Sequence, residues 1–119
     1  MRDKSNWNAT PKGVHRGVSA YFCHNSYAAE VIEVTVKDGI PKVEKVVAAI
    51  DCGIVVNKDA AINMAEGAIV DAIGNALYGE LTFKDGQPQK SNFGEYRMIR
   101  MDDTPASIAI HFVENQHAP

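Results

Sequence analysis

The segment from Lys58 to Leu81 constrains the fold most strongly, because its apolar residues recur with the period of an α-helix. Most residues on this stripe are small: Ala61, Ala65, Ala68, Ile69, Ala72, Ile73, Ala76 and Leu77. Gly67 and Gly74 lie within the same segment, although a glycine costs a helix interior roughly 1 kcal/mol relative to alanine. We therefore expect one long helix, capped at its start by Asn57, whose backbone comes close to a sheet or to a ligand.

Strands are predicted on the N-terminal side of this helix. Gly17 to Ser26 is expected to be extended with a turn near its end, and the following residues alternate between apolar and polar up to Val36. Lys37-Asp38-Gly39 has the composition of a hairpin turn, and the return strand is predicted from about Lys42 to Asp51. Residues 46–50 are apolar on both faces, which is typical of a central strand covered on both sides.

More strands are predicted after the helix. Asp85-Gly86 is a second hairpin turn, residues 93–101 are expected to be extended, and Ser107 to Val113 alternates as a final strand. Strands on both sides of one helix indicate an α+β fold with two layers. We expect a mixed or antiparallel sheet that carries one long helix rich in small residues.

Two expectations concern packing and exposure. The helix stripe should pack on the strand face that bears Ile32, Val34 and Val36, so that Ala72→Leu would overpack it and cost roughly 1–3 kcal/mol. Apolar residues near the first and last strands are expected to be exposed: Tyr21, Phe22, Phe112 and Val113. Because large apolar patches usually find partners, we expect the chain to self-associate, by edge pairing of the last strand.

The composition excludes several kinds of partner and site. The formal net charge is −3 without a basic run, which argues against nucleic acid, and the apolar stretches are too short for a membrane span. The two cysteines, Cys23 and Cys52, have no zinc-site spacing, and we expect both to be buried. His24, His111 and His117 do not cluster with carboxylates, so no metal site is predicted. Nothing in the sequence indicates a cellular compartment.

Three sets of polar residues are candidates for binding, and each has an ordinary alternative. Glu66 either hydrogen-bonds a ligand at the small-residue surface or lies on a solvated helix face. Asp51 follows an apolar run, and is either a desolvated carboxylate or the cap of a turn. The third set forms either a surface ion-pair cluster or an anion site: Tyr96, Arg97, Arg100, Asp102 and Asp103.

Five motifs, taken in order, resemble one known family. They are Ser26-Tyr27-Ala28-Ala29-Glu30-Val31, residues 47–53 with Val55-Val56-Asn57, Glu66-Gly67-Ala68-Ile69, Ala76-Leu77-Tyr78-Gly79-Glu80, and residues 92–97 with Arg100, Met101 and Pro105. Over roughly residues 17–119 the chain resembles the C-terminal molybdopterin-binding region of the xanthine dehydrogenase/aldehyde oxidase family, and in particular large (beta) subunits of isoquinoline 1-oxidoreductase type. Residues 1–16, which lack a period, are expected to be a disordered or frayed lead-in. Residues 17–119 are then part of the molybdopterin-binding domain of a larger subunit.

The resemblance implies a molybdenum-dependent oxidoreductase that hydroxylates an N-heterocycle or oxidises an aldehyde. In such enzymes a glutamate acts as general base toward a molybdenum-bound hydroxide, and the cofactor carries the hard step. Electrons leave through iron–sulfur clusters, which in this type lie on a separate small subunit. The implied partners are the remainder of the large subunit and this iron–sulfur subunit.

Two departures from the family pattern bear on the site. The family's catalytic glutamate follows a proline that corresponds to Pro119, where this sequence stops. We therefore assign no catalytic residue, and predict that the isolated chain is inactive and binds no cofactor. A helix position that is usually glutamine in the family is Met64, whose thioether cannot donate a hydrogen bond. By resemblance, the cofactor-binding residues are Met64, Glu66 and Gly67.

Two functions remain open. The chain is either a segment of a molybdenum hydroxylase large subunit that supplies one wall of the molybdopterin site, or a non-catalytic α+β interaction module that kept the architecture and lost the site. Met64 favours the second alternative, because it removes a hydrogen-bonding side chain from the cofactor surface.

Overall fold

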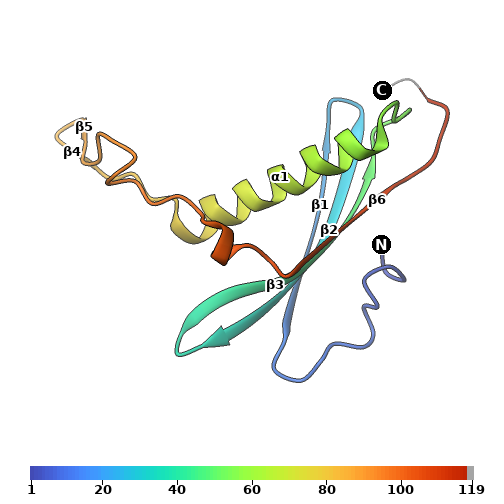
Figure 1. Ribbon diagram of the computed structural model, residues 1–119, viewed down its shortest axis with the longest axis horizontal. Coiled ribbons are helices and arrows are strands. Elements are labelled where there is room, and N and C mark those ends of the chain that lie inside the picture. Colours follow the sequence, from blue (N-terminus) through green and yellow to red (C-terminus); the bar gives the residue numbers. More distant parts are fainter. Residues whose placement is uncertain (118–119) are drawn as a thin grey trace.

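One helix lies across one face of a four-stranded sheet in the computed structural model, which describes residues 1–117 (Figure 1). The sheet strands, in chain order, are β1 (His15–Cys23), β2 (Ser26–Lys37), β3 (Ile40–Asp51) and β6 (Ser107–Phe112). The first three strands pair antiparallel, and β6 pairs parallel to β3, giving the order β1-β2-β3-β6. The predicted two-layer α+β fold with a mixed sheet is confirmed.

The helix α1 (Lys58–Tyr78) begins and ends at residues whose local chemistry explains its bounds. At its start, the Asn57 Oδ1 accepts a hydrogen bond from the Ala60 N–H at 3.0 Å, as expected of an N-cap. The helix ends three residues before the predicted Leu81. A Cβ at Gly79 would lie 2.7 Å from the Asn75 carbonyl oxygen, so glycine permits the tight exit there.

The connecting turns use residues in the left-handed backbone region. Asp38 (φ 54°) and Gly39 (φ 79°) join β2 to β3, as predicted from their composition. Asp85 and Gly86 have the same conformation in the second predicted hairpin, which joins β4 (Phe83–Lys84) to β5 (Gln87–Pro88). Both hairpin predictions are confirmed.

The core between helix and sheet is built on the large residues of the helix stripe. Ile69 and Ile73 are buried against three residues of β3: Val43, Val46 and Ala48. Partly buried side chains pack around them: Ile32, Val34, Leu77, Ile99, Ile108 and Ile110. The predicted packing on the face of Ile32 and Val34 is therefore confirmed.

Other parts of the packing prediction are wrong. Val36 is 54% exposed, because it lies near the hairpin end of β2, beyond the reach of the helix. Ala68, Ala72 and Ala76 are exposed, because the helix rests on its isoleucines and turns its alanines outward. Ala72→Leu would place its side chain in open space, and the predicted overpacking does not follow.

The leading segment, residues 1–7, covers part of the opposite face of the sheet. Ser5 is buried, and a hollow between this segment and the sheet is lined by Trp7, Val18 and Val31, among others. Arg16 holds the segment in place, because its Nη1 donates to the Asn6 and Trp7 carbonyl oxygens, each at 2.9 Å. The same guanidinium pairs with Glu33, with Nε to Oε1 at 3.0 Å. The strand β1 also begins at His15, two residues before the predicted start.

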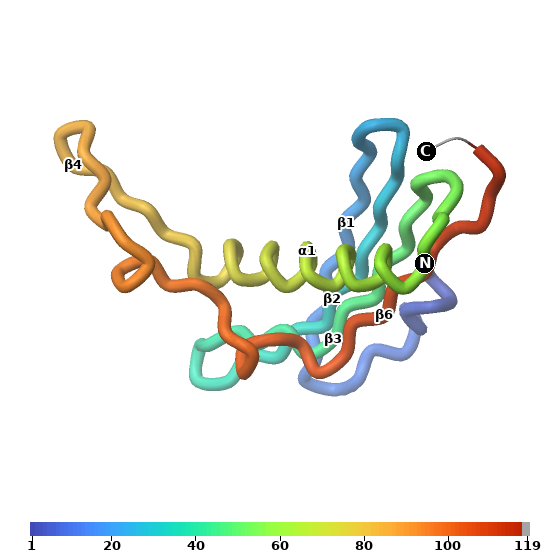
Figure 2. Tube along the Cα trace, turned by 45° about the horizontal axis from the view of Figure 1, so that its top comes forward, coloured from blue at the N-terminus to red at the C-terminus, as the bar shows by residue number. Residues whose placement is uncertain are grey.

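The β4–β5 hairpin forms an arm that projects away from the sheet (Figure 2). Residues 93–101 return from this arm and were predicted to be extended, but they form no strand. They contain turns and then enter the short 3₁₀ helix η1 (Met101–Asp103), where the Arg100 N–H donates to the Asp103 carboxylate at 3.2 Å. We call residues 96–103 the strap, because Ile99 packs on α1 while the chain returns to β6.

The described part of the chain ends shortly after β6. Val113 N–H donates to the Ile50 carbonyl oxygen at 2.8 Å, which continues the contact with β3 past Phe112. Ala118 and Pro119 lie outside the described residues, and with them the position that corresponds to the proline before the family's glutamate. Within residues 1–117, no helix combines the length and apolar character that a membrane crossing needs.

Candidate functional site

The side of α1 that faces away from the sheet is a long, open surface of small and polar residues. We call it the outer face, and its exposed residues are Asn63, Met64, Gly67, Ala68, Asp71, Ala72, Asn75 and Ala76. A Cβ added at Gly67 would meet no other atom within 4 Å. Another backbone or a flat ligand can therefore approach the helix closely at this point.

Two of the three predicted cofactor residues lie on this outer face. Met64 is 77% exposed and Gly67 lies one helical turn further along. Glu66 is half-buried instead, on the side of the helix that also bears Ile62 and Ile69. The structure thus brings Met64 and Gly67 together and places Glu66 away from them, between the predicted solvated face and the core.

Asn63 is a candidate that the sequence analysis missed. Its side chain is exposed beside Met64, four residues before Gly67, so the two share one line along the outer face. An amide can both donate and accept hydrogen bonds, which the thioether of Met64 cannot. The spacing of four between Asn63 and Gly67 was the available signal in the sequence.

Asp51 fixes the end of the sheet. The Asn115 amide donates to its Oδ1, which ties the segment after β6 to the end of β3. A further bond joins the same two segments, from the Ile54 N–H to the His117 carbonyl oxygen at 3.2 Å. These contacts favour a structural role for Asp51. This role is similar to the alternative in which Asp51 caps a turn.

The cluster of Tyr78, Arg97 and Asp103 favours the ion-pair alternative over an anion site. The Arg97 guanidinium lies 3.7 Å from the centre of the Tyr78 ring, and its Nη2 lies 3.7 Å from the Asp103 Oδ2. Burial, and then the neighbouring Asp103 carboxylate, raise the pKa of Tyr78. The Asp103 carboxylate thus already neutralises the guanidinium, and these contacts fasten the strap to the end of α1.

Neither cysteine is fully buried, so that prediction is wrong. Cys23 lies at the exposed end of β1, with its Sγ 2.8 Å from the His24 Nδ1, and Cys52 follows the end of β3. Both positions are at the rim of the sheet, where the helix does not reach. Within residues 1–117, no three metal-ligating side chains come together.

Residues 2–105 match the family described as "Molybdopterin cofactor-binding domain". The chain belongs to this family. The match includes the leading segment, which the resemblance in the sequence did not cover. The matched region therefore includes parts of both layers of the fold and the outer face of α1.

Named relatives of this molybdopterin-binding domain are subunits of oxidoreductases. The chain is 29% identical over 112 residues to nicotine 6-hydroxylase large subunit of Paenarthrobacter nicotinovorans, and 32% identical over 108 residues to isoquinoline 1-oxidoreductase subunit beta of Brevundimonas diminuta. These matches cover 87% and 89% of this chain. A solved structure of quinoline 2-oxidoreductase from Pseudomonas putida 86 aligns with a TM-score of 0.63 and 26% identity, over 76% of this chain.

The matched region is a small part of each relative. The chain spans 13% and 14% of the two curated relatives and 12% of the quinoline 2-oxidoreductase chain. Family membership consequently concerns this domain, whose relatives lie within much longer subunits.

Proposed function

We propose that this chain is part of a molybdenum hydroxylase large subunit that oxidises an N-heterocycle or an aldehyde, and that α1 supplies one wall of its molybdopterin site. Two named relatives are a nicotine hydroxylase and an isoquinoline oxidoreductase, which supports the N-heterocycle class. Both are named as subunits, which supports an assembly with further chains. By the family resemblance, one of these chains would carry the iron–sulfur clusters.

The observation that carries this proposal is the amount of apolar surface left open. Sixteen large apolar side chains are exposed in residues 1–117, against seven apolar residues that are buried. A stand-alone domain of this size rarely leaves so much apolar surface in water. The balance is instead expected of a domain that is covered by other parts of a larger protein.

The outer face of α1 offers open space and hydrogen-bonding groups to a large polar cofactor. Gly67 leaves the helix backbone open to close approach, and Asn63 offers amide hydrogen bonds beside it. Met64 contributes surface but no donor, so in this chain we assign the polar contact to Asn63. Glu66 lies on the half-buried side of the helix, away from this surface, so we assign it no cofactor contact. The bound molybdenum centre would supply the oxidation itself.

A chimeric subunit tests this assignment. This chain replaces the matching segment of the Brevundimonas diminuta isoquinoline 1-oxidoreductase subunit beta, and molybdenum and pterin are measured per purified subunit. Gly67→Trp should place a large ring where the cofactor is proposed to lie, so the purified chimera should contain no pterin. Gly94→Trp is the matched control, because a Cβ at Gly94 also meets no atom within 4 Å. Full cofactor content in the Gly67→Trp chimera would exclude α1 from the site.

The alternative, a non-catalytic interaction module, is favoured by one observation, the methionine at position 64. The coding sequence downstream of Pro119 separates the two. A Gly-x-Gly-Glu motif within the next thirty or so codons supports the large subunit, and a stop codon supports the interaction module.

A further inference from the structure

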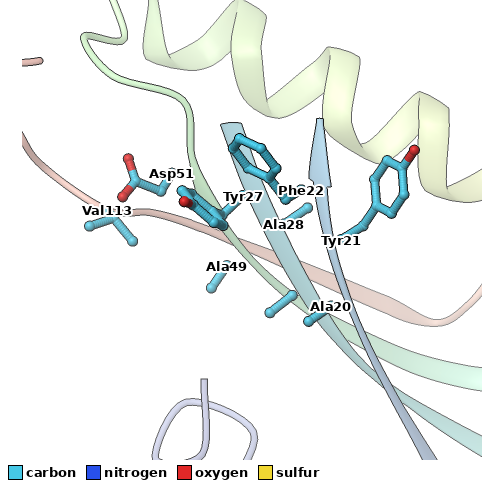
Figure 3. Close-up of a pocket in the computed structure, with 9 residues that line it drawn as sticks. Ala20, Tyr21, Phe22, Tyr27, Ala28, Ala49, Asp51 and Val113 are labelled. Atoms are coloured by element: carbon cyan, nitrogen blue, oxygen red, sulfur yellow. The ribbon is translucent and has the colours of Figure 1, made fainter. Parts of the chain in front are cut away.

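The face of the sheet opposite α1 has a hollow of about 490 Å³ at the end where β1 meets β2. Its floor is a row of three alanines on adjacent strands, since Ala20 pairs with Ala29 and Ala29 with Ala49. Figure 3 shows Val113, Asp51, Tyr27 and Phe22 next to one another at the ends of the strands, with the labelled alanines below them. We call it the alanine hollow.

The neighbouring row of the same face shows how this surface is covered elsewhere. Two residues along each strand from the alanines lie Val18, Val31 and Val47, on the same face because side chains alternate. Val31 and Val47 are each 2% exposed, and the leading segment with Trp7 lies over this part of the face, while Val18 on the edge strand stays 63% exposed. The covering layer stops there, and the alanine row next to it is left open.

The rim of the hollow is apolar and projects from the sheet. The rings of Phe22 and Tyr27 lie 4.6 Å apart, and both side chains are more than half exposed. Large aromatic side chains beside a floor of alanines leave a space that fits bulky side chains from an opposing layer. An occupant of this space would continue the layer that residues 1–7 begin.

We propose that the alanine hollow is the docking surface for a segment of the large subunit outside these 119 residues. This inference rests on the proposed function, under which the chain is a small part of a much longer polypeptide, as it is in the relatives it matches. The segment presents a large apolar side chain to the alanine floor and a basic side chain or N–H donor to Asp51.

Charge disfavours a second copy of the chain as the occupant. A twofold pairing places the same surface patch on both sides, so it would bring two Asp51 carboxylates into an interface whose lining offers neither of them a basic side chain. Like charges at a desolvated interface are unfavourable. The same carboxylate is complementary to a donor from a different polypeptide segment.

Binding to a subunit that lacks the matching segment tests the inference. The probe is the Brevundimonas diminuta isoquinoline 1-oxidoreductase subunit beta with that segment deleted, titrated with the 119-residue chain. Ala20→Arg, on the floor of the hollow, should weaken binding at least about ten-fold. Ser19→Arg is the control, because Ser19 is the adjacent residue on the same strand and points to the other face. Phe22→Ser serves as a second variant if Ala20→Arg fails to fold, and should weaken binding similarly.

The outcomes separate this inference from the proposed function. Equal binding by wild-type chain, Ala20→Arg and Phe22→Ser would overturn the docking surface, while a cofactor-loaded chimera would still support the proposed function. No binding by the wild-type chain would overturn the inference, and an empty chimera would in addition overturn the proposed function. A dimer of the chain that Ala20→Arg dissociates, without binding to the probe, would assign the hollow to a second copy and also overturn it.

Discussion

Gly74 in α1 lies directly against the branched side chain of Ile99 in the strap. A Cβ built at Gly74 would be 2.8 Å from the Ile99 Cβ, which is closer than such atoms can approach. Ile99 is also packed against the core that contains Ile69 and Ile73. Because Gly74 has no side chain, the strap can cross α1 closely enough for Ile99 to pack on the core.

Replacing Gly74 by alanine should destabilise the chain. Because the nearest atom is the Cβ of Ile99 and not the end of a flexible side chain, we expect a loss of roughly 1–3 kcal/mol in the free energy of unfolding. Gly67→Ala is the control and should stabilise the chain by up to about 1 kcal/mol, since its site is open. Urea denaturation measures both. Equal midpoints for the two variants would show that the strap does not press on the helix.

The two glycines also show how far the sequence predicted the site. Helical periodicity predicted the helix and a close approach to its backbone, but could not say which glycine would be buried. That depends on the strap, whose residues have no period because single side chains such as Ile99 and Arg97 make its contacts. The burial of the stripe was mispredicted for a similar reason. Ile69 and Ile73 are large enough to determine which side faces the sheet, so Ala72 is turned outward.

Arg16→Met should release the leading segment from the sheet. The side chain is 6% exposed and donates to the Asn6 and Trp7 carbonyls as well as to Glu33, so its loss leaves a largely buried carboxylate unpaired. We expect a cost of about 3 kcal/mol. Trp7 is the only tryptophan, and its emission should shift to the red with more quenching by iodide. Arg97 contacts Tyr78 instead, so Arg97→Met should leave the emission unchanged. An unchanged spectrum in Arg16→Met would contradict the role of Arg16 in holding the leading segment on the sheet.

The raised pKa of Tyr78 predicts that the chain loses stability at alkaline pH. Burial, followed by the Asp103 carboxylate, raises the pKa of this phenol above its ordinary value of 10.0, so the unfolded chain ionises it first. The stabilising contribution is complete below that ordinary value and is lost as the pH rises through the raised folded-state value. As the pH rises above that ordinary value, Tyr78→Phe should therefore lose less unfolding free energy than the wild-type chain. Parallel losses in the two proteins would show that Tyr78 is solvated like a free tyrosine.

The isolated chain should self-associate at micromolar concentration. Tyr21, Phe22 and Val113 are exposed as predicted, while Phe112 is half-buried, and the outer edge of β6 faces no other strand within residues 1–117. Exposed strand edges and apolar patches favour pairing. Ala109→Pro in the edge strand tests this pairing, and should weaken self-association. Ile110→Lys is unsuitable for this test, because Ile110 packs on the core. Light scattering that shows a monomer of 12.9 kDa up to millimolar concentration would contradict this prediction.

The central claim is that this chain is one wall of a molybdopterin site that other parts of a large subunit complete. Its most direct test is the pterin and molybdenum content of three purified proteins: the 119-residue chain, the chimeric subunit that contains it, and the same subunit with the segment deleted. The account predicts cofactor in the chimera only. Cofactor bound by the isolated chain, or an assembled chimera that carries none, would contradict it.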